Sequence, residues 1–294
     1  MLDGSAGCDS DAVLTVIGDL VEDIVVWTEA PTRPGTDNPA VVSRSRGGSA
    51  ANVAARAAGL APSRFVGRVG DDPTGSWLTE ALAAAGVDVR VQRAGRTGAV
   101  VIVVDPTDGE RTMYPDRGAA ATLEPIDHDW LTGTSLLHVP AYGFTTEPAA
   151  GSILDAIAHV RRRGSQLSID VSAATVVEEI GRERFVDLLD RLEPELVLAN
   201  AEEADALGLH GRCPPPGGVI VIKDGPRPAI VTFDDGTRRQ VDAIPVVDVR
   251  DTTGAGDAFA AGLLTSWMAG AEPASACADG HRSAATVLTS AGAG

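Results

Sequence analysis

The chain has 294 residues, of which 44% are hydrophobic and 22% are charged, so it can bury one large core and does not have the composition of a disordered chain. Its formal net charge of −17 disfavours electrostatic binding to nucleic acid or to anionic lipid headgroups over the whole surface. Any phosphate site must therefore be local.

The N-terminal part begins with residues 1–11, which lack the basic start and the apolar stretch of a secretory signal. We expect an N-terminal extension here and a soluble, cytoplasmic protein without a membrane span. Residues 12–26 are typical of a buried strand that ends near Gly18, followed by a second apolar alternation. A polar, proline-containing segment leads to residues 49–60, where small residues and a closing glycine predict a helix.

The next part predicts a short strand over residues 65–70, a helix over 74–87 and a β-rich stretch over 98–115. The Asp108-Gly109 pair is typical of a hairpin turn. Two β-rich segments, near residues 22–46 and 97–115, interrupt the alternation of strands and helices. We expect them to form a small lid over the main sheet.

From residue 135 to the C-terminus, strands and helices alternate. Strands are expected at 135–139, 166–171, 196–200, 219–225 and 229–233, and helices at 152–164 and 184–192. Strands joined by helical crossovers predict an α/β fold in which helices cover both faces of a mostly parallel sheet. We expect one domain over residues 12–294.

The sequence DTTGAGDAF, residues 251–259, carries the strongest chemical signal. Residues 246–249 have the apolar character of a strand, and Phe259, Leu263 and Trp267 recur at helical spacing, so the glycines lie at a strand-to-helix turn. Glycines let a ligand approach the main chain closely. The N–H groups at a helix start, reinforced by the helix dipole, form an anion site.

An acid in the same turn as an anion site needs an explanation. Asp251 could be an N-terminal cap and Asp257 an acid favoured by the helix dipole. A carboxylate there would however repel a bound phosphate, whereas a base that takes the proton of an attacking hydroxyl belongs beside it. The P-loop pattern and the full dinucleotide fingerprint are absent from the sequence, which disfavours a P-loop enzyme or a Rossmann dehydrogenase.

Two motifs together resemble the signatures of the ribokinase/phosphofructokinase-B family of carbohydrate kinases. DTTGAGDAF resembles the C-terminal signature, and GGSAANVA at residues 47–54 resembles the N-terminal one. The segment GRVGDDPTG at residues 67–75 is similar to a further family segment. The resemblance extends over residues 12–294 and implies a three-layer ribokinase-like fold with a β-rich lid. It also implies an ATP-dependent kinase that phosphorylates a hydroxymethyl group of a sugar or sugar-like substrate.

The resemblance assigns the reacting groups and the substrate pocket. Asp257 would be the general base, and the backbone N–H groups of Gly254, Ala255 and Gly256 would form an anion hole for the transferred phosphoryl group. The same resemblance implies a substrate pocket formed by Asp23, Gly47, Gly48 and Asn52. An acid and an amide can together accept hydrogen bonds from, and donate them to, neighbouring hydroxyls.

For ATP and Mg²⁺ the resemblance points to other segments. Asn200 and Glu203 match an N-x-x-E element, in which Glu203 would bind Mg²⁺ through water. The adjacent Glu202 is the competing assignment. The residues expected near the nucleotide are Asn200, Glu203, Lys223, Gly225 and Thr252, and the chain departs from the family at Pro228, where a second glycine is usual. Asp251 and Thr253 match a monovalent-cation site that would bind K⁺ in some members.

Several alternatives remain open at this point. The substrate could be a sugar, a sugar acid or a nucleoside, and a non-catalytic sugar or nucleotide sensor is a second hypothesis. A nucleotide-dependent oxidoreductase is a weaker third. Arg111 and Arg117 could approach an anionic substrate, although solvated lid charges are the simpler interpretation. The resemblance also implies a homodimer formed through the lid.

Overall fold

The computed structural model describes residues 12–107, 109–247, 249 and 252–289. Its main element is a nine-stranded sheet with the strand order β13-β12-β11-β10-β9-β8-β1-β4-β5. The strands are β1 (Val13–Gly18), β4 (Ser63–Val69), β5 (Asp88–Arg93), β8 (Thr134–Pro140), β9 (Gln166–Asp170), β10 (Leu196–Asn200), β11 (Val219–Asp224), β12 (Arg227–Phe233) and β13 (Arg238–Val241). Pairing is parallel from β5 to β11 and antiparallel at β12 and β13.

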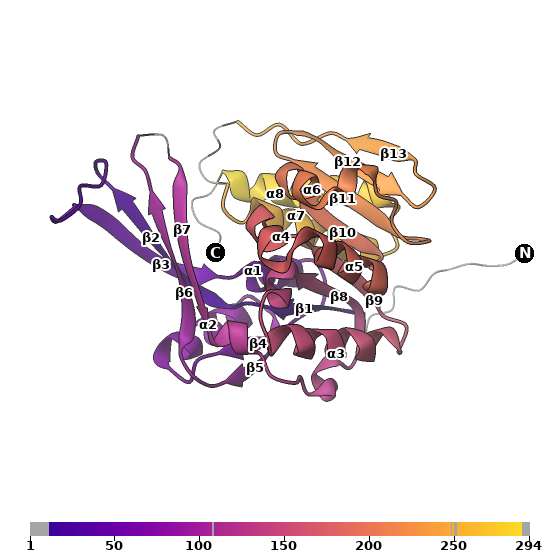
Figure 1. Ribbon diagram of the computed structural model, residues 1–294, viewed down its shortest axis with the longest axis horizontal. Helices are drawn as coiled ribbons and strands as arrows, with labels where there is room; N and C mark the ends of the chain where they lie inside the picture. Colours follow the sequence, from indigo (N-terminus) through magenta and orange to yellow (C-terminus); the bar gives the residue numbers. More distant parts are fainter. Residues whose placement is uncertain (1–11, 108, 248, 250–251, 290–294) are drawn as a thin grey trace, which may run out of the picture.

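Helices cover both faces of this sheet and make a three-layer structure (Figure 1). One face carries α1 (Ser49–Ala58), α2 (Pro73–Ala84), α7 (Ala255–Met268) and α8 (Pro273–Leu288). The other carries α3 (Ala149–Arg161), α4 (Ala174–Ile180), α5 (Arg182–Leu192) and α6 (Ala201–Leu207). Short 3₁₀ turns are η1 (Ala119–Thr122), η2 (His128–Leu131), η3 (Ala141–Phe144) and η4 (Leu209–Gly211). A hydrophobic core lies between the sheet and the helices on each face, which explains why the central strands are apolar on both faces.

A second sheet of four strands extends away from the main sheet (Figure 1). Its order is β3-β2-β6-β7, with β2 at Val21–Thr28, β3 at Ala40–Gly47, β6 at Thr97–Val104 and β7 at Arg111–Gly118. Pairing between β2 and β6 is parallel, and the other two pairs are antiparallel. We call these four strands the lid. The α/β prediction with a small β-rich lid is confirmed.

One predicted element is wrong. Within the described part of residues 246–249, no β-strand is found, and Val247 and Val249 are exposed. The apolar residues of this segment do not pack into either core. The strand that ends this part of the chain is instead β13, which pairs with β12 and whose polar sequence Arg238–Val241 gave no signal.

None of the helices in the described ranges combines the length and the apolar character needed to cross a bilayer.

Candidate active site

Polar side chains gather where the central strands end. Asp19 follows β1, while Asp170 ends β9, Asn200 ends β10 and Lys223 lies next to the end of β11. Because these strands are parallel, their carboxyl ends meet at one edge of the sheet, the usual position of ligand sites in open α/β sheets. The start of α7 packs at this edge, and Arg111 of the lid hydrogen-bonds to the hydroxyl of Thr253 in the turn before α7.

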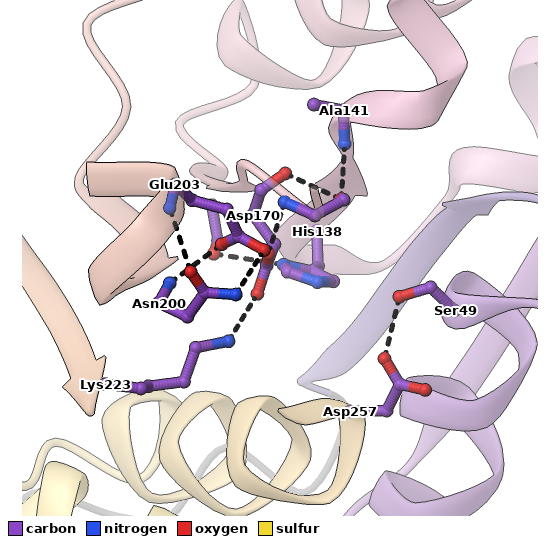
Figure 2. A network of polar contacts seen from close by, with 10 residues as sticks. Ser49, His138, Ala141, Asp170, Asn200, Glu203, Lys223 and Asp257 are labelled. Carbon is purple, nitrogen blue, oxygen red and sulfur yellow. Dashed lines mark hydrogen bonds and ion pairs between the residues drawn. The ribbon is translucent and has the colours of Figure 1, made fainter. Parts of the chain in front are cut away.

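Asp257 lies in the first turn of α7 and is held by α1. The hydroxyl of Ser49 donates to Oδ1 at 2.7 Å, and the amide of Asn52 donates to Oδ2 at 3.0 Å. Figure 2 shows the contact between Ser49 and Asp257. Burial raises the pKa of Asp257 to about 6, against the opposing effect of these two hydrogen bonds. The carboxylate is therefore oriented and partly desolvated, as a general base requires.

The turn before α7 leaves two glycine amides open. Gly254 has a φ of 73°, in the left-handed region that favours glycine. In the described part of the chain, the N–H groups of Gly254 and Gly256 have no acceptor, whereas the N–H of Ala255 donates to the carbonyl of Thr252 at 3.2 Å. Of the three predicted anion-hole amides, those of Gly254 and Gly256 are thus available to a ligand here.

Gly47 and Asp23 fit against each other at the base of the lid. A Cβ at Gly47 would lie 2.1 Å from Oδ1 of Asp23, so only glycine leaves room for this carboxylate. Asp23 is buried, and its pKa is raised to about 6 by burial and by the neighbouring carboxylates of Asp19 and Asp257. The predicted substrate acid and the predicted base therefore lie near each other, although they are more than two hundred positions apart.

Gly48 and Asn52 complete the predicted substrate residues. Gly48 has a φ of 99°, and a Cβ there would lie 2.5 Å from the carbonyl oxygen of Asp19. Asn52 is buried on α1, where its Oδ1 accepts from Arg46 at 2.9 Å while its Nδ2 faces Asp257. Arg46 thereby fixes which end of the amide points toward Asp257.

Lys223 reaches across the carboxyl edge to Asp170, as Figure 2 shows, with 3.0 Å between Nζ and Oδ2. Both side chains are mostly buried. Despite burial, the pKa of Lys223 is raised, because Asp170 and Glu203 favour the ammonium. A Cβ at Gly256 would lie 3.8 Å from Nζ, which places the ammonium beside the start of α7.

Asn200 and Glu203 lock each other at the start of α6. Glu203 accepts from the Asn200 backbone at 2.7 Å and from its amide at 2.8 Å, and Asn200 accepts the Glu203 N–H at 2.9 Å. This is a capping box. Burial, followed by the carboxylate of Asp170, raises the pKa of Glu203 to about 7. Although Lys223 offsets part of the repulsion between Glu203 and Asp170, a divalent cation held through water would relieve the rest, so these two acids fit Mg²⁺.

The remaining predicted residues are less informative. Thr252 is exposed before α7, and Gly225 has a φ of 56° in the turn between β11 and β12. Thr253 is half-buried and contacts Arg111, while Asp251, its predicted partner in a cation site, lies outside the described residues. The nucleotide and K⁺ assignments of these positions stay predictions.

Sequence reasoning missed several residues of this site. Ser49, Arg46 and Asp170 contact the predicted residues directly, and Asp19 pairs at 2.7 Å with Arg117, a residue that the sequence had raised without a partner. The interpretation of Arg111 and Arg117 as solvated lid charges is wrong, since both are half-buried and reach the main body. The acid at the end of the buried strand 166–170 was a usable signal. The Arg117 pair, which joins the lid to the end of β1, left no local pattern.

A ribokinase-like three-layer fold, with an acid and open amides at one helix start, defines the class of this protein as a phosphotransferase. Similarity to known proteins supports the same class. The family model described as pfkB family carbohydrate kinase matches residues 12–294. A fructokinase of Klebsiella pneumoniae is 33% identical over 273 residues, which cover 86% of this chain and 84% of that protein.

Two further relatives extend the range. An ATP-dependent ribose-1-phosphate kinase of Halopiger xanaduensis is 32% identical, covering 80% of this chain and 78% of that protein. The crystal structure of adenosine kinase from Sinorhizobium meliloti is similar with a TM-score of 0.82 and 26% identity, covering 96% of this chain and 95% of that chain. The chain belongs to the pfkB family of carbohydrate kinases. The prediction of an ATP-dependent carbohydrate kinase is thereby confirmed.

Proposed function

We propose that this kinase transfers the γ-phosphoryl group of ATP to a hydroxymethyl group of a sugar, with Asp257 as the general base. The observation that carries this proposal is the position of the Asp257 carboxylate beside the open amides of Gly254 and Gly256. The hydroxyl proton passes to Asp257 while the oxygen attacks the γ-phosphorus and ADP leaves. The amides, and Ala255 if its bond to Thr252 opens, stabilise charge that develops on the transferred group.

The other site residues serve positioning. Asp23 and Asn52, with the backbone at Gly47 and Gly48, would bind the sugar hydroxyls. Asn200, Lys223, Gly225 and Thr252 would lie along the nucleotide. Glu203 would hold Mg²⁺ through water. The bound ion would neutralise charge on the phosphates of ATP. In such a site most of the acceleration comes from orientation and fixed charges, because the protein forms no covalent bond to the substrate.

An ADP-release assay on a substrate panel tests the function. We expect saturable ADP formation from ATP and Mg²⁺ with D-fructose or D-ribose. Adenosine belongs in the panel, because an adenosine kinase is among the similar structures and a nucleoside kinase is the second candidate. Tight, saturable binding of a sugar without any ADP would contradict catalysis and favour a sensor.

We also propose that two copies associate through the outer face of the lid. Cross-strand neighbours on one face of a sheet lie side by side, which places Val42 beside Val26 and Tyr114 beside Val101 on the face opposite to Asp23. Val42 and Tyr114 are 58% and 59% exposed. An apolar face of this kind is typical of an interaction surface.

Charge on this face should prevent the association. We expect Val42→Glu combined with Tyr114→Glu to convert a dimer into a monomer in light scattering, since two carboxylates would have to be buried. Trp77→Glu, at an exposed aromatic on α2, is the matched control and should leave the mass unchanged. A wild-type protein that is monomeric at assay concentrations would contradict the proposal.

A further inference from the structure

Five charged side chains lie at or next to the residues proposed to bind the sugar. Carboxylates come from Asp19 after β1, Asp23 on β2 and Asp257 on α7, and guanidinium groups come from Arg46 on β3 and Arg117 on β7. After burial, the carboxylates of Asp19 and Asp257 raise the pKa of Asp23, as expected for acids that lie near one another. Lys223 and Asp170 also act on Asp257, but they pair with each other and so add no net charge to this set.

Arg117 is held at its place by two contacts. Its Nη1 lies 2.7 Å from Oδ2 of Asp19, and its guanidinium stacks over the ring of Tyr142 at 3.8 Å from the centroid. The side chains of Arg117 and Asp19 are only 23% and 9% exposed. The three residues line a small cavity whose other walls are largely apolar, formed by residues such as Leu123 and Ile153.

Asp19 is in turn fixed from the other side. Its Oδ1 accepts the backbone N–H of Ala50 at 3.3 Å in the first turn of α1, where the helix dipole also favours a carboxylate. An incoming anion therefore cannot easily displace Asp19 from Arg117. The other guanidinium, that of Arg46, donates to the neutral amide of Asn52 and so keeps its positive charge beside the acids.

These contacts decide which substrate charge the pocket accepts. With Arg117 neutralised by Asp19, the groups left to face a substrate carboxylate or phosphate are two acids, Asp23 and Asp257, and one guanidinium, Arg46, which together carry one net negative charge when both acids are ionised. A negatively charged group on the substrate would be repelled by this net negative charge, because charges interact more strongly in a half-buried pocket than in water. A neutral sugar meets only hydrogen-bonding groups.

We propose that the Asp19–Arg117 pair makes this kinase select uncharged sugars over their carboxylate or phosphate counterparts. The inference rests on the proposed function, because it concerns the substrate of the same site. Asp19 and Arg117 are then specificity-determining residues. Removing the charge of Asp19 frees a guanidinium that an anionic substrate can use.

A matched substrate pair tests the proposal. D-fructose and 2-keto-D-gluconate differ in having a hydroxymethyl group or a carboxylate at C1, and both carry the C6 hydroxymethyl group. We expect the wild type to prefer D-fructose in kcat/KM. Asp19→Asn keeps an acceptor for the Ala50 N–H and should shift the ratio toward 2-keto-D-gluconate by about tenfold or more, as expected for one nearby charge in a partly buried site.

Two further variants separate charge from structure. Asp19→Asn/Arg117→Gln has the same net pocket charge as the wild type and should return the ratio toward the wild-type value. Asp116→Asn on β7 frees Arg96, which lies directly before β6 and forms an exposed pair with Asp116, and should not move the ratio. The same ratios are measured as dissociation constants by calorimetry.

The outcomes distinguish the two proposals. An unchanged ratio in Asp19→Asn, or a wild type that prefers 2-keto-D-gluconate, would overturn the charge selection and leave the kinase assignment intact. Absence of ADP release with every substrate would count against the proposed function, while the ratio of dissociation constants would still decide the selection.

Discussion

Replacing Asp257 by Asn should lower kcat by about 10²–10⁴-fold and leave the affinity for ATP nearly unchanged, in line with typical general-base contributions. The amide keeps the shape of the carboxylate but cannot take the proton of the substrate hydroxyl. Single-turnover ADP formation and ATP titration measure the two quantities. Near-normal turnover in this variant would refute the role of Asp257 and with it the proposed mechanism.

One control variant and two measurements of pH dependence make this result specific. Asp187→Asn, at an exposed acid on α5, should leave kcat unchanged. In the wild type, kcat/KM should fall as the pH decreases through about 6, because a base must be ionised and Asp257 becomes protonated there. Ser49→Ala removes a hydrogen bond that favours the carboxylate, so this acid limb should move to higher pH.

The orientation of Asp257 connects the lid to the chemistry. Arg46 belongs to the lid strand β3, and it donates to the oxygen of the Asn52 amide, which leaves the amide nitrogen to donate to Asp257. Because an amide has one accepting and one donating end, the lid guanidinium sets the direction of the second hydrogen bond. The position of the lid and the orientation of the Asp257 carboxylate are thus physically linked.

Much of the arrangement could be predicted from the sequence, because it depends on local patterns. The alternation of strands and helices predicted the sheet, and the glycine-rich turn before Phe259 predicted the start of α7. Parallel strands end at one edge, so the acids and amides that follow them had to meet there. The two motifs placed Asn52 and Asp257 at this edge, where the structure joins them by a hydrogen bond.

The rest depends on contacts between distant segments. Arg117 and Asp19 are 98 positions apart, and their pairing depends on how the lid sits over the end of β1. No pattern of spacing in the sequence predicts that these two side chains meet in space. The strand predicted at 246–249 failed for a different reason, because there a local pattern was present but the tertiary contact was not. An apolar run forms a strand only if a neighbouring strand or core covers it, and here Val247 is exposed.

The second large effect concerns stability. Asp170→Asn should lower the free energy of unfolding by about 3–5 kcal/mol, because it removes the hydrogen-bonded counter-charge of the mostly buried Lys223 ammonium. Lys223→Met should be comparably destabilising, since it leaves the carboxylates of Asp170 and Glu203 facing each other. Urea unfolding of the purified variants at neutral pH measures both.

The exposed pair of Asp224 and Arg227 in the next hairpin provides the matched comparison. Its side chains are 30% and 73% exposed, so Asp224→Asn should cost no more than about 1 kcal/mol, as solvent-screened pairs do. The double variant Lys223→Met/Asp170→Leu should lose less stability than the two single variants together, because neither charge is left alone. If Asp170→Asn were no more costly than Asp224→Asn, the buried pair would contribute nothing to the fold, and Lys223 would be free to turn toward the nucleotide.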